Sequence, residues 1–254
     1  MIAQLIEEQC ANNFAGNAED RENVYQELMN DNIAPFIGII KNFFNSESMR
    51  DLQTLNERVL KTALLALIPF SGRVSELCLM ADSRKPYGQG HYKFPDLFVA
   101  KRSLLDIWTL SIVVELKLFS LLGLLSGDTG SWHSNFTASQ LSNFNKSLGL
   151  EEEEALLKRK YIPYSRAEMT TIGDVLKCAI TQLKEYMLII AMGPWKLSND
   201  AKFSGVNDTH VGIITNRNEK FLDGYVILAV GTCRFIVCKL DRISMNVCYY
   251  VLQS

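Results

Sequence analysis

The sequence predicts an α/β protein, because helical and extended segments follow one another along its 254 residues. Residues 1–68 carry apolar side chains at steps of three and four, a spacing typical of helices. Two extended segments are expected next, over residues 92–100 and 108–119. A long amphipathic helix over residues 172–192 then precedes further strands, and these segments together define the class.

The first part of the chain is expected to form a helical region of its own, over residues 1–69. Pro35 and Pro69 punctuate it, since proline interrupts helices. A further helix is predicted over residues 71–80, with Glu76 among apolar neighbours. Residues 70–254 are taken as a second domain.

The two extended segments are predicted to pair as a hairpin, joined by the polar connection that contains Lys101 and Arg102. Val113 and Val114 favour a strand in the second segment. Its apolar residues run without a break, which is typical of a strand covered on both faces.

Residues 126–171 change composition, first to Ser, Asn, Gly and Thr and then to charged residues, and are predicted to be an insertion. Glu154 and Lys158 are four apart with the acid first, which favours a solvated helix. Lys158, Arg159 and Lys160 are also candidate contacts to a phosphate backbone.

The predicted helix over residues 172–192 ends at Gly193 and Pro194. Gln182 and Tyr186 are four apart in it, so they are expected to project from neighbouring turns. Strands are predicted after it over residues 210–215, 225–230 and 234–240.

The composition is that of a globular protein, with 48% hydrophobic and 21% charged residues. The net charge of −2 gives no general attraction to nucleic acid, so any such contact must come from local patches. Six cysteines without a CxxC pair predict free thiols in a reducing intracellular compartment, either nucleus or cytoplasm. The three histidines have no metal-ligand spacing.

Glu115 and Lys117 are the only charges in the apolar run from Ile107 to Leu125. In a membrane each would cost about 2.5–3.5 kcal/mol, so the run is not expected to span one. In a protein core each costs several kcal/mol unless it is paired, neutralised or bound to a ligand.

On a strand these two residues face the same side, and Asp96 on the neighbouring strand can add a second carboxylate. Two carboxylates on fixed strands suit Mg²⁺, or Mn²⁺, and an ammonium can orient an attacking water. The alternatives are a turn residue for Asp96 and a simple salt bridge for Glu115 with Lys117.

The pattern of Pro95-Asp96 followed by Glu115-Leu116-Lys117 resembles the PD-(D/E)XK, or restriction-endonuclease-like, nuclease superfamily. The resemblance implies a core in the order helix, strand, strand, strand, helix, strand, with a central mixed β-sheet flanked by helices. It also implies a ligand from the first core helix, where Glu76 stands. Members often carry Gln-x-x-x-Tyr on the later helix, matched by Gln182 and Tyr186, and residues 210–216 resemble the strand that pairs beyond that helix.

The resemblance implies a metal-dependent nuclease that hydrolyses phosphodiester bonds, with endonuclease action on DNA as the favoured reading. Asp96, Glu115 and Glu76 are then the metal ligands, and Lys117 the catalytic cation. Five basic residues are the candidate phosphate contacts: Lys101, Arg102, Lys158, Arg159 and Lys160. The alternative is an inactive module that binds nucleic acid or a protein, with residues 1–69 docking a partner or forming a homodimer.

Overall fold

The computed structural model of the protein describes residues 18–46, 56–68, 72–81, 92–100, 108–130, 135–163, 168–193, 195–196, 203–214 and 219–252. It is an α/β structure built on a central mixed sheet, as the sequence predicts.

The central sheet has five strands in the order β1-β4-β5-β11-β12. Their bounds are β1 Arg73–Ser75, β4 Leu97–Ala100, β5 Trp108–Phe119, β11 Glu219–Val230 and β12 Arg234–Ser244. β1, β4 and β5 form an antiparallel meander, which confirms the predicted hairpin of the two extended segments. β11 pairs with β5 in parallel, and a parallel pair needs a crossover connection. Helix α8, Ile172–Met192, lies in that crossover and agrees with its predicted range.

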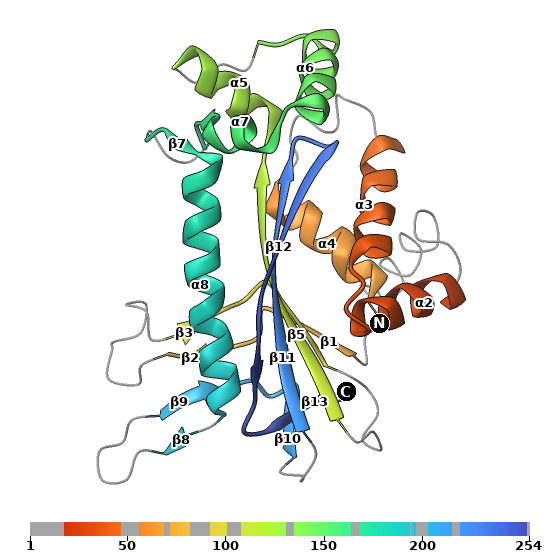
Figure 1. Ribbon diagram of the computed structural model, residues 1–254, viewed down its shortest axis with the longest axis vertical. Helices are drawn as coiled ribbons and strands as arrows, with labels where there is room; N and C mark the ends of the chain where they lie inside the picture. The colour runs from red at the N-terminus through yellow and green to blue at the C-terminus, as the bar shows by residue number, and fades with distance from the viewer. Residues whose placement is uncertain are drawn as a thin grey trace.

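Helices cover both faces of this sheet (Figure 1). α8 packs on one face, where Val113 of β5 shares a hydrophobic cluster with Leu183 and Met187. Three helices pack on the other face: α2 Ala18–Met29, α3 Ala34–Ser46 and α4 Glu57–Leu67. Leu116 of β5 belongs to their cluster together with Leu60 of α4. The N-terminal helices therefore share one core with the sheet, and β5 is buried on both faces as predicted.

The segment between β5 and α8 forms a helical layer beyond the end of β5, at the top of Figure 1. It contains α5 Leu121–Thr129, α6 Ala138–Leu150, α7 Glu153–Lys158 and the short strands β6 Lys160–Tyr161 and β7 Thr170–Thr171. Glycines let α5 lie directly against β6, because a Cβ on Gly127 would stand 2.2 Å from the Lys160 carbonyl oxygen. A Cβ on Gly123 would stand 2.3 Å from the Tyr161 ring, so this close approach fixes the position of Tyr161.

Two smaller sheets lie near the opposite end of α8 (Figure 1). One has the order β3-β2-β9-β8, and the other pairs β10 with β13. Their bounds are β2 Leu79–Met80, β3 Tyr92–Lys93, β8 Trp195–Lys196, β9 Phe203–Val206, β10 Val211–Ile214 and β13 Cys248–Val251. None of the described helices is long and apolar enough to cross a membrane.

One predicted helix and one predicted strand pairing are wrong, whereas the strand expected over residues 210–215 is itself present as β10. The helix expected over residues 71–80 is replaced by β1 and β2, because Val74 pairs with Phe98 and Leu79 with Val206. These long-range pairings outweigh the helix-like spacing of the apolar residues. The strand expected over residues 210–215 pairs with β13, whereas the strand that joins the central sheet after α8 is β11.

Candidate active site

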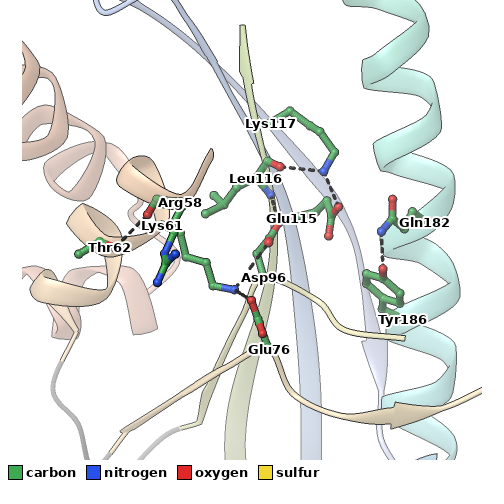
Figure 2. A network of polar contacts seen from close by, with 10 residues as sticks. All are labelled: Arg58, Lys61, Thr62, Glu76, Asp96, Glu115, Leu116, Lys117, Gln182 and Tyr186. Carbon is green, nitrogen blue, oxygen red and sulfur yellow. Dashed lines mark hydrogen bonds and ion pairs between the residues drawn. The ribbon is translucent and has the colours of Figure 1, made fainter. Parts of the chain in front are cut away.

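The candidate site lies where β4 separates from β5. The pairing of these strands begins at Leu97 opposite Val114, so β5 continues toward its C-terminal end without β4 beside it. Asp96, just before β4, covers this opening, and its Oδ2 accepts a hydrogen bond of 2.8 Å from the backbone N–H of Leu116 (Figure 2). Asp96 is thereby held next to Glu115 and Lys117.

Glu115 and Lys117 project from β5 toward α8, and Leu116 between them points into the opposite core, as predicted (Figure 2). The Lys117 ammonium donates hydrogen bonds to Glu115 Oε1 at 2.8 Å and to the Leu116 carbonyl at 2.9 Å. Glu115 is only 2% exposed. Its second carboxylate oxygen, Oε2, is buried and has no hydrogen-bond partner among the described residues. Buried polar atoms are normally paired, so this oxygen is available to a ligand.

The electrostatics of the site follow from this burial. Burial raises the pKa of Glu115 to about 7, against the opposing effect of Lys117, and the charge of Asp96 raises it further. Burial acts to lower the pKa of Lys117, but the carboxylates of Glu115, Glu57 and Asp96 outweigh it, and that pKa is raised. Three carboxylates thus act on one ammonium, and Asp96 also has the Lys61 Nζ at 3.9 Å. Such a cluster favours binding of a cation or a proton.

Glu57 is a site residue that the sequence reasoning missed. It is the first residue of α4, and its carboxylate accepts a hydrogen bond from the backbone N–H of Leu118. Glu57 as a whole residue is exposed, but burial of its carboxylate raises the pKa of that group. The sequence did contain a signal for where this helix begins. Asn56 is a typical N-cap residue before apolar residues at helical spacing, which places Glu57 in the first turn of the last helix before the first strand.

Glu76, predicted as a helical residue and a metal ligand, occupies a different environment. It lies in the turn after β1 with φ +57°, and its side chain is 68% exposed. Its carboxylate accepts a hydrogen bond of 2.9 Å from Lys61, and this ion pair lowers its pKa. The Lys61 ammonium contacts both Glu76 and Asp96, so the two carboxylates share a cation (Figure 2).

Gln182 and Tyr186 lie on neighbouring turns of α8, as predicted, and face the sheet near Glu115 (Figure 2). The Gln182 amide donates a hydrogen bond to the Tyr186 hydroxyl. Burial raises the pKa of Tyr186, and the charge of Glu115 acts in the same direction. Tyr186 is therefore a neutral neighbour of the carboxylate cluster.

Three of the predicted phosphate contacts are described by the structure, and these three are not part of this cluster. Lys101 and Arg102 lie outside the described residues. The Arg159 guanidinium forms ion pairs with Glu151, at 2.6 Å, and Asp128, at 2.9 Å, so its charge is already balanced. Lys158 and Lys160 are exposed on α7 and β6.

A cavity of about 610 Å³ opens beside Lys117, between the end of β5, β6 and the first half of α8. Glu57 and Gln182 line it together with Lys117. The remaining wall combines apolar side chains with two further carboxylates, those of Glu168 and Asp174.

The residues present fit a hard divalent cation. Within the described ranges no three His, Cys, Asp or Glu side chains are already grouped as a complete ligand set. Mg²⁺ does not need one, because it is usually bound by one or two carboxylates and keeps several waters. The free Oε2 of Glu115 and the nearby carboxylates of Asp96 and Glu57 supply that donor chemistry. Searches for known relatives find no matching protein-family model, no curated protein and no solved structure.

Proposed function

We propose that the protein is a metal-dependent nuclease of the PD-(D/E)XK, or restriction-endonuclease-like, class that hydrolyses phosphodiester bonds, with DNA as the favoured substrate. The order of elements supports this class: helix α4, the meander β1-β4-β5, the crossover helix α8 and the parallel strand β11. In that order the acids and the lysine lie on and beside the central strand β5, where β4 leaves it.

The observation that carries the proposal is the buried carboxylate of Glu115, which has one oxygen on Lys117 and the other without a hydrogen-bond partner in the part of the chain that the structure describes. A purely structural ion pair in a core is favourable only when its remaining polar atoms are also satisfied. Asp96 and Glu57 add more negative charge instead of balancing it. An arrangement that is costly for folding but suited to a cation favours a binding site over a simple salt bridge.

Glu115 and Asp96 are the residues that would hold Mg²⁺ or Mn²⁺, and Glu57 would support them with further negative charge. A bound divalent cation supplies Lewis-acid polarisation of a phosphoryl oxygen and lowers the pKa of a bound water. Lys117 has the charge and the position to orient the attacking water and to stabilise negative charge that develops on the phosphate. The Leu116 N–H, by its hydrogen bond to Oδ2, would keep the Asp96 carboxylate in position beside the metal.

The direct test is a cleavage assay with purified protein on plasmid DNA, linear duplex, single-stranded DNA and RNA, with Mg²⁺, Mn²⁺ or a chelator. We expect cleavage of at least one substrate with metal and none with chelator. Binding of nucleic acid without cleavage under any of these conditions would instead support the inactive binding module.

A matched pair of variants tests which glutamate belongs to the site. Glu57→Gln is expected to weaken Mn²⁺ binding by about 10–100-fold, the usual effect of losing a group that supports a metal site. Glu76→Gln is expected to leave Mn²⁺ affinity within about twofold, because its carboxylate is engaged by Lys61 and exposed to solvent. Isothermal titration calorimetry measures both, and thermal unfolding controls for folding. Equal affinities of the two variants would exclude Glu57 as a group that supports the metal site.

A further inference from the structure

The cavity beside Lys117 has the size and position of a substrate pocket. Its volume of about 610 Å³ lies within the roughly 300–1,000 Å³ range of small-molecule sites. It begins at Glu57 and Lys117, and so directly adjoins the carboxylate cluster. A molecule in this cavity would therefore lie against Lys117 and next to the carboxylate cluster.

Its wall offers flat and apolar surfaces. Tyr161, Met169 and Val175 line it together with Phe119, and the rings of Phe119 and Tyr161 contact edge to face with centroids 4.9 Å apart. Phe119 is itself buried, so Tyr161 is the aromatic side chain of this pair that can contact a base, and bases stack on aromatic side chains largely without regard to sequence.

The charges of the wall argue against the phosphate backbone as the occupant. Among the described lining residues, Lys117 is the single cation, whereas Glu57, Glu168 and Asp174 are acidic. Proteins bind phosphates with cations. Repulsion from these carboxylates would therefore leave the part of the cavity near Lys117 as the place for a phosphate. Asp174 accepts a hydrogen bond from Thr171 at 2.7 Å and has Lys177 at 3.8 Å. Carboxylates and the Gln182 amide are suited to the polar edges of a base.

We infer that this cavity receives one unpaired nucleobase, so that the adjoining phosphate lies at Glu115 and Lys117 and the substrate is single-stranded or locally unpaired nucleic acid. The inference rests on the proposed nuclease function. A base inside a duplex must first be extruded from the stack before it can enter, whereas an unpaired base enters without that cost.

The first test compares cleavage of one sequence as a single strand, as a perfect duplex and as a duplex with a central bubble. We expect the single strand and the bubble to be cut at least about tenfold faster than the duplex, because of the cost of extruding a base. Equal or faster cleavage of the perfect duplex would overturn the inference while leaving the nuclease proposal intact.

The second test does not require cleavage. A short fluorescein-labelled single strand of mixed sequence is titrated with the protein in chelator, and anisotropy reports binding. Val175→Trp, which fills the cavity, is expected to weaken binding at least about tenfold, whereas Leu188→Trp, on an exposed part of the same helix, is expected to leave it unchanged. Thermal unfolding verifies that both variants fold.

The two proposals can fail separately in these experiments. Single-strand binding that Val175→Trp removes, without cleavage, supports the base pocket and contradicts the nuclease. No preference for single strand over duplex, or equal binding by the parent and Val175→Trp with the fold intact, overturns the base pocket. A smaller variant, Val175→Phe, replaces Val175→Trp if the latter does not fold.

Discussion

Glu115→Gln is expected to lower the rate of metal-dependent cleavage by at least about 100-fold, because the change removes the negative charge that binds the cation and the cation contributes several kcal/mol to transition-state stabilisation. The neutral amide can still accept the hydrogen bond that Lys117 donates at 2.8 Å, so the geometry of β5 is kept. Cleavage kinetics with saturating Mg²⁺, together with Mn²⁺ titration, measure the effect. Unchanged cleavage by a folded variant would exclude Glu115 as a ligand.

The buried carboxyl of Glu115 also makes the stability of the parent depend on pH, and Glu115→Gln is expected to remove that dependence. The folded protein holds the Glu115 proton with a pKa of about 7, against an ordinary value of 4.5. Its contribution to stability is therefore fully present below about pH 4.5 and is lost as the pH rises through about 7. Glu115→Gln lacks this loss, and we expect it to be at least as stable as the parent at pH 8 in thermal unfolding.

Metal binding needs the ionised carboxylate of Glu115, so the Mn²⁺ affinity of the parent is expected to rise with pH through about 7.

Lys117→Met is expected to reduce the rate of cleavage by about 10²–10³-fold, the usual cost of removing one preorganised electrostatic contact to the transition state. At a pH high enough to ionise Glu115 in the variant, metal affinity should be kept or increased, because a cation next to the Glu115 carboxylate has been removed. Single-turnover cleavage and calorimetry separate these two effects. The matched control is Lys184→Met, an exposed lysine on α8, which should leave both unchanged. A Lys117→Met variant that loses metal binding but cuts at the parental rate when metal is saturating would contradict the assigned role.

Lys117→Met also leaves the Glu115 carboxylate buried without its ion-pair partner. The pKa of Glu115 is expected to rise further above about 7, because Lys117 is the group that opposes its desolvation. The variant should then lose more stability than the parent between pH 6 and pH 9, measured by thermal unfolding across that range. Parallel stability curves for the two proteins would contradict the ion pair seen in the structure.

Local patterns determined a large part of the fold. The unbroken apolar run containing Val113 and Val114 predicted a strand covered on both faces, and β5 is such a strand. The spacing of apolar residues over residues 172–192 predicted α8. Alternation along a strand also placed Glu115 and Lys117 on one face and Leu116 on the other. These features depend on residues close in sequence, whose periodicity directly reflects which side is buried.

The sequence predicted Asp96 beside Glu115 and Lys117, and only the tertiary structure decided which other acids and cations lie near them. Asp96 is held at the site by the hydrogen bond that it accepts from the Leu116 N–H, and Glu57 lies there because α4 packs against the sheet. Arg159 forms ion pairs with Glu151 and Asp128 instead. The segment over residues 71–80 became strands for the same reason, since its partners lie far along the chain. Contacts of this kind are set by packing between distant segments, and no local spacing encodes them. The sequence by itself determined the face that Glu115 and Lys117 share and indicated Asp96 as their neighbour, and the packing of α4 against the sheet determined that Glu57 joins them.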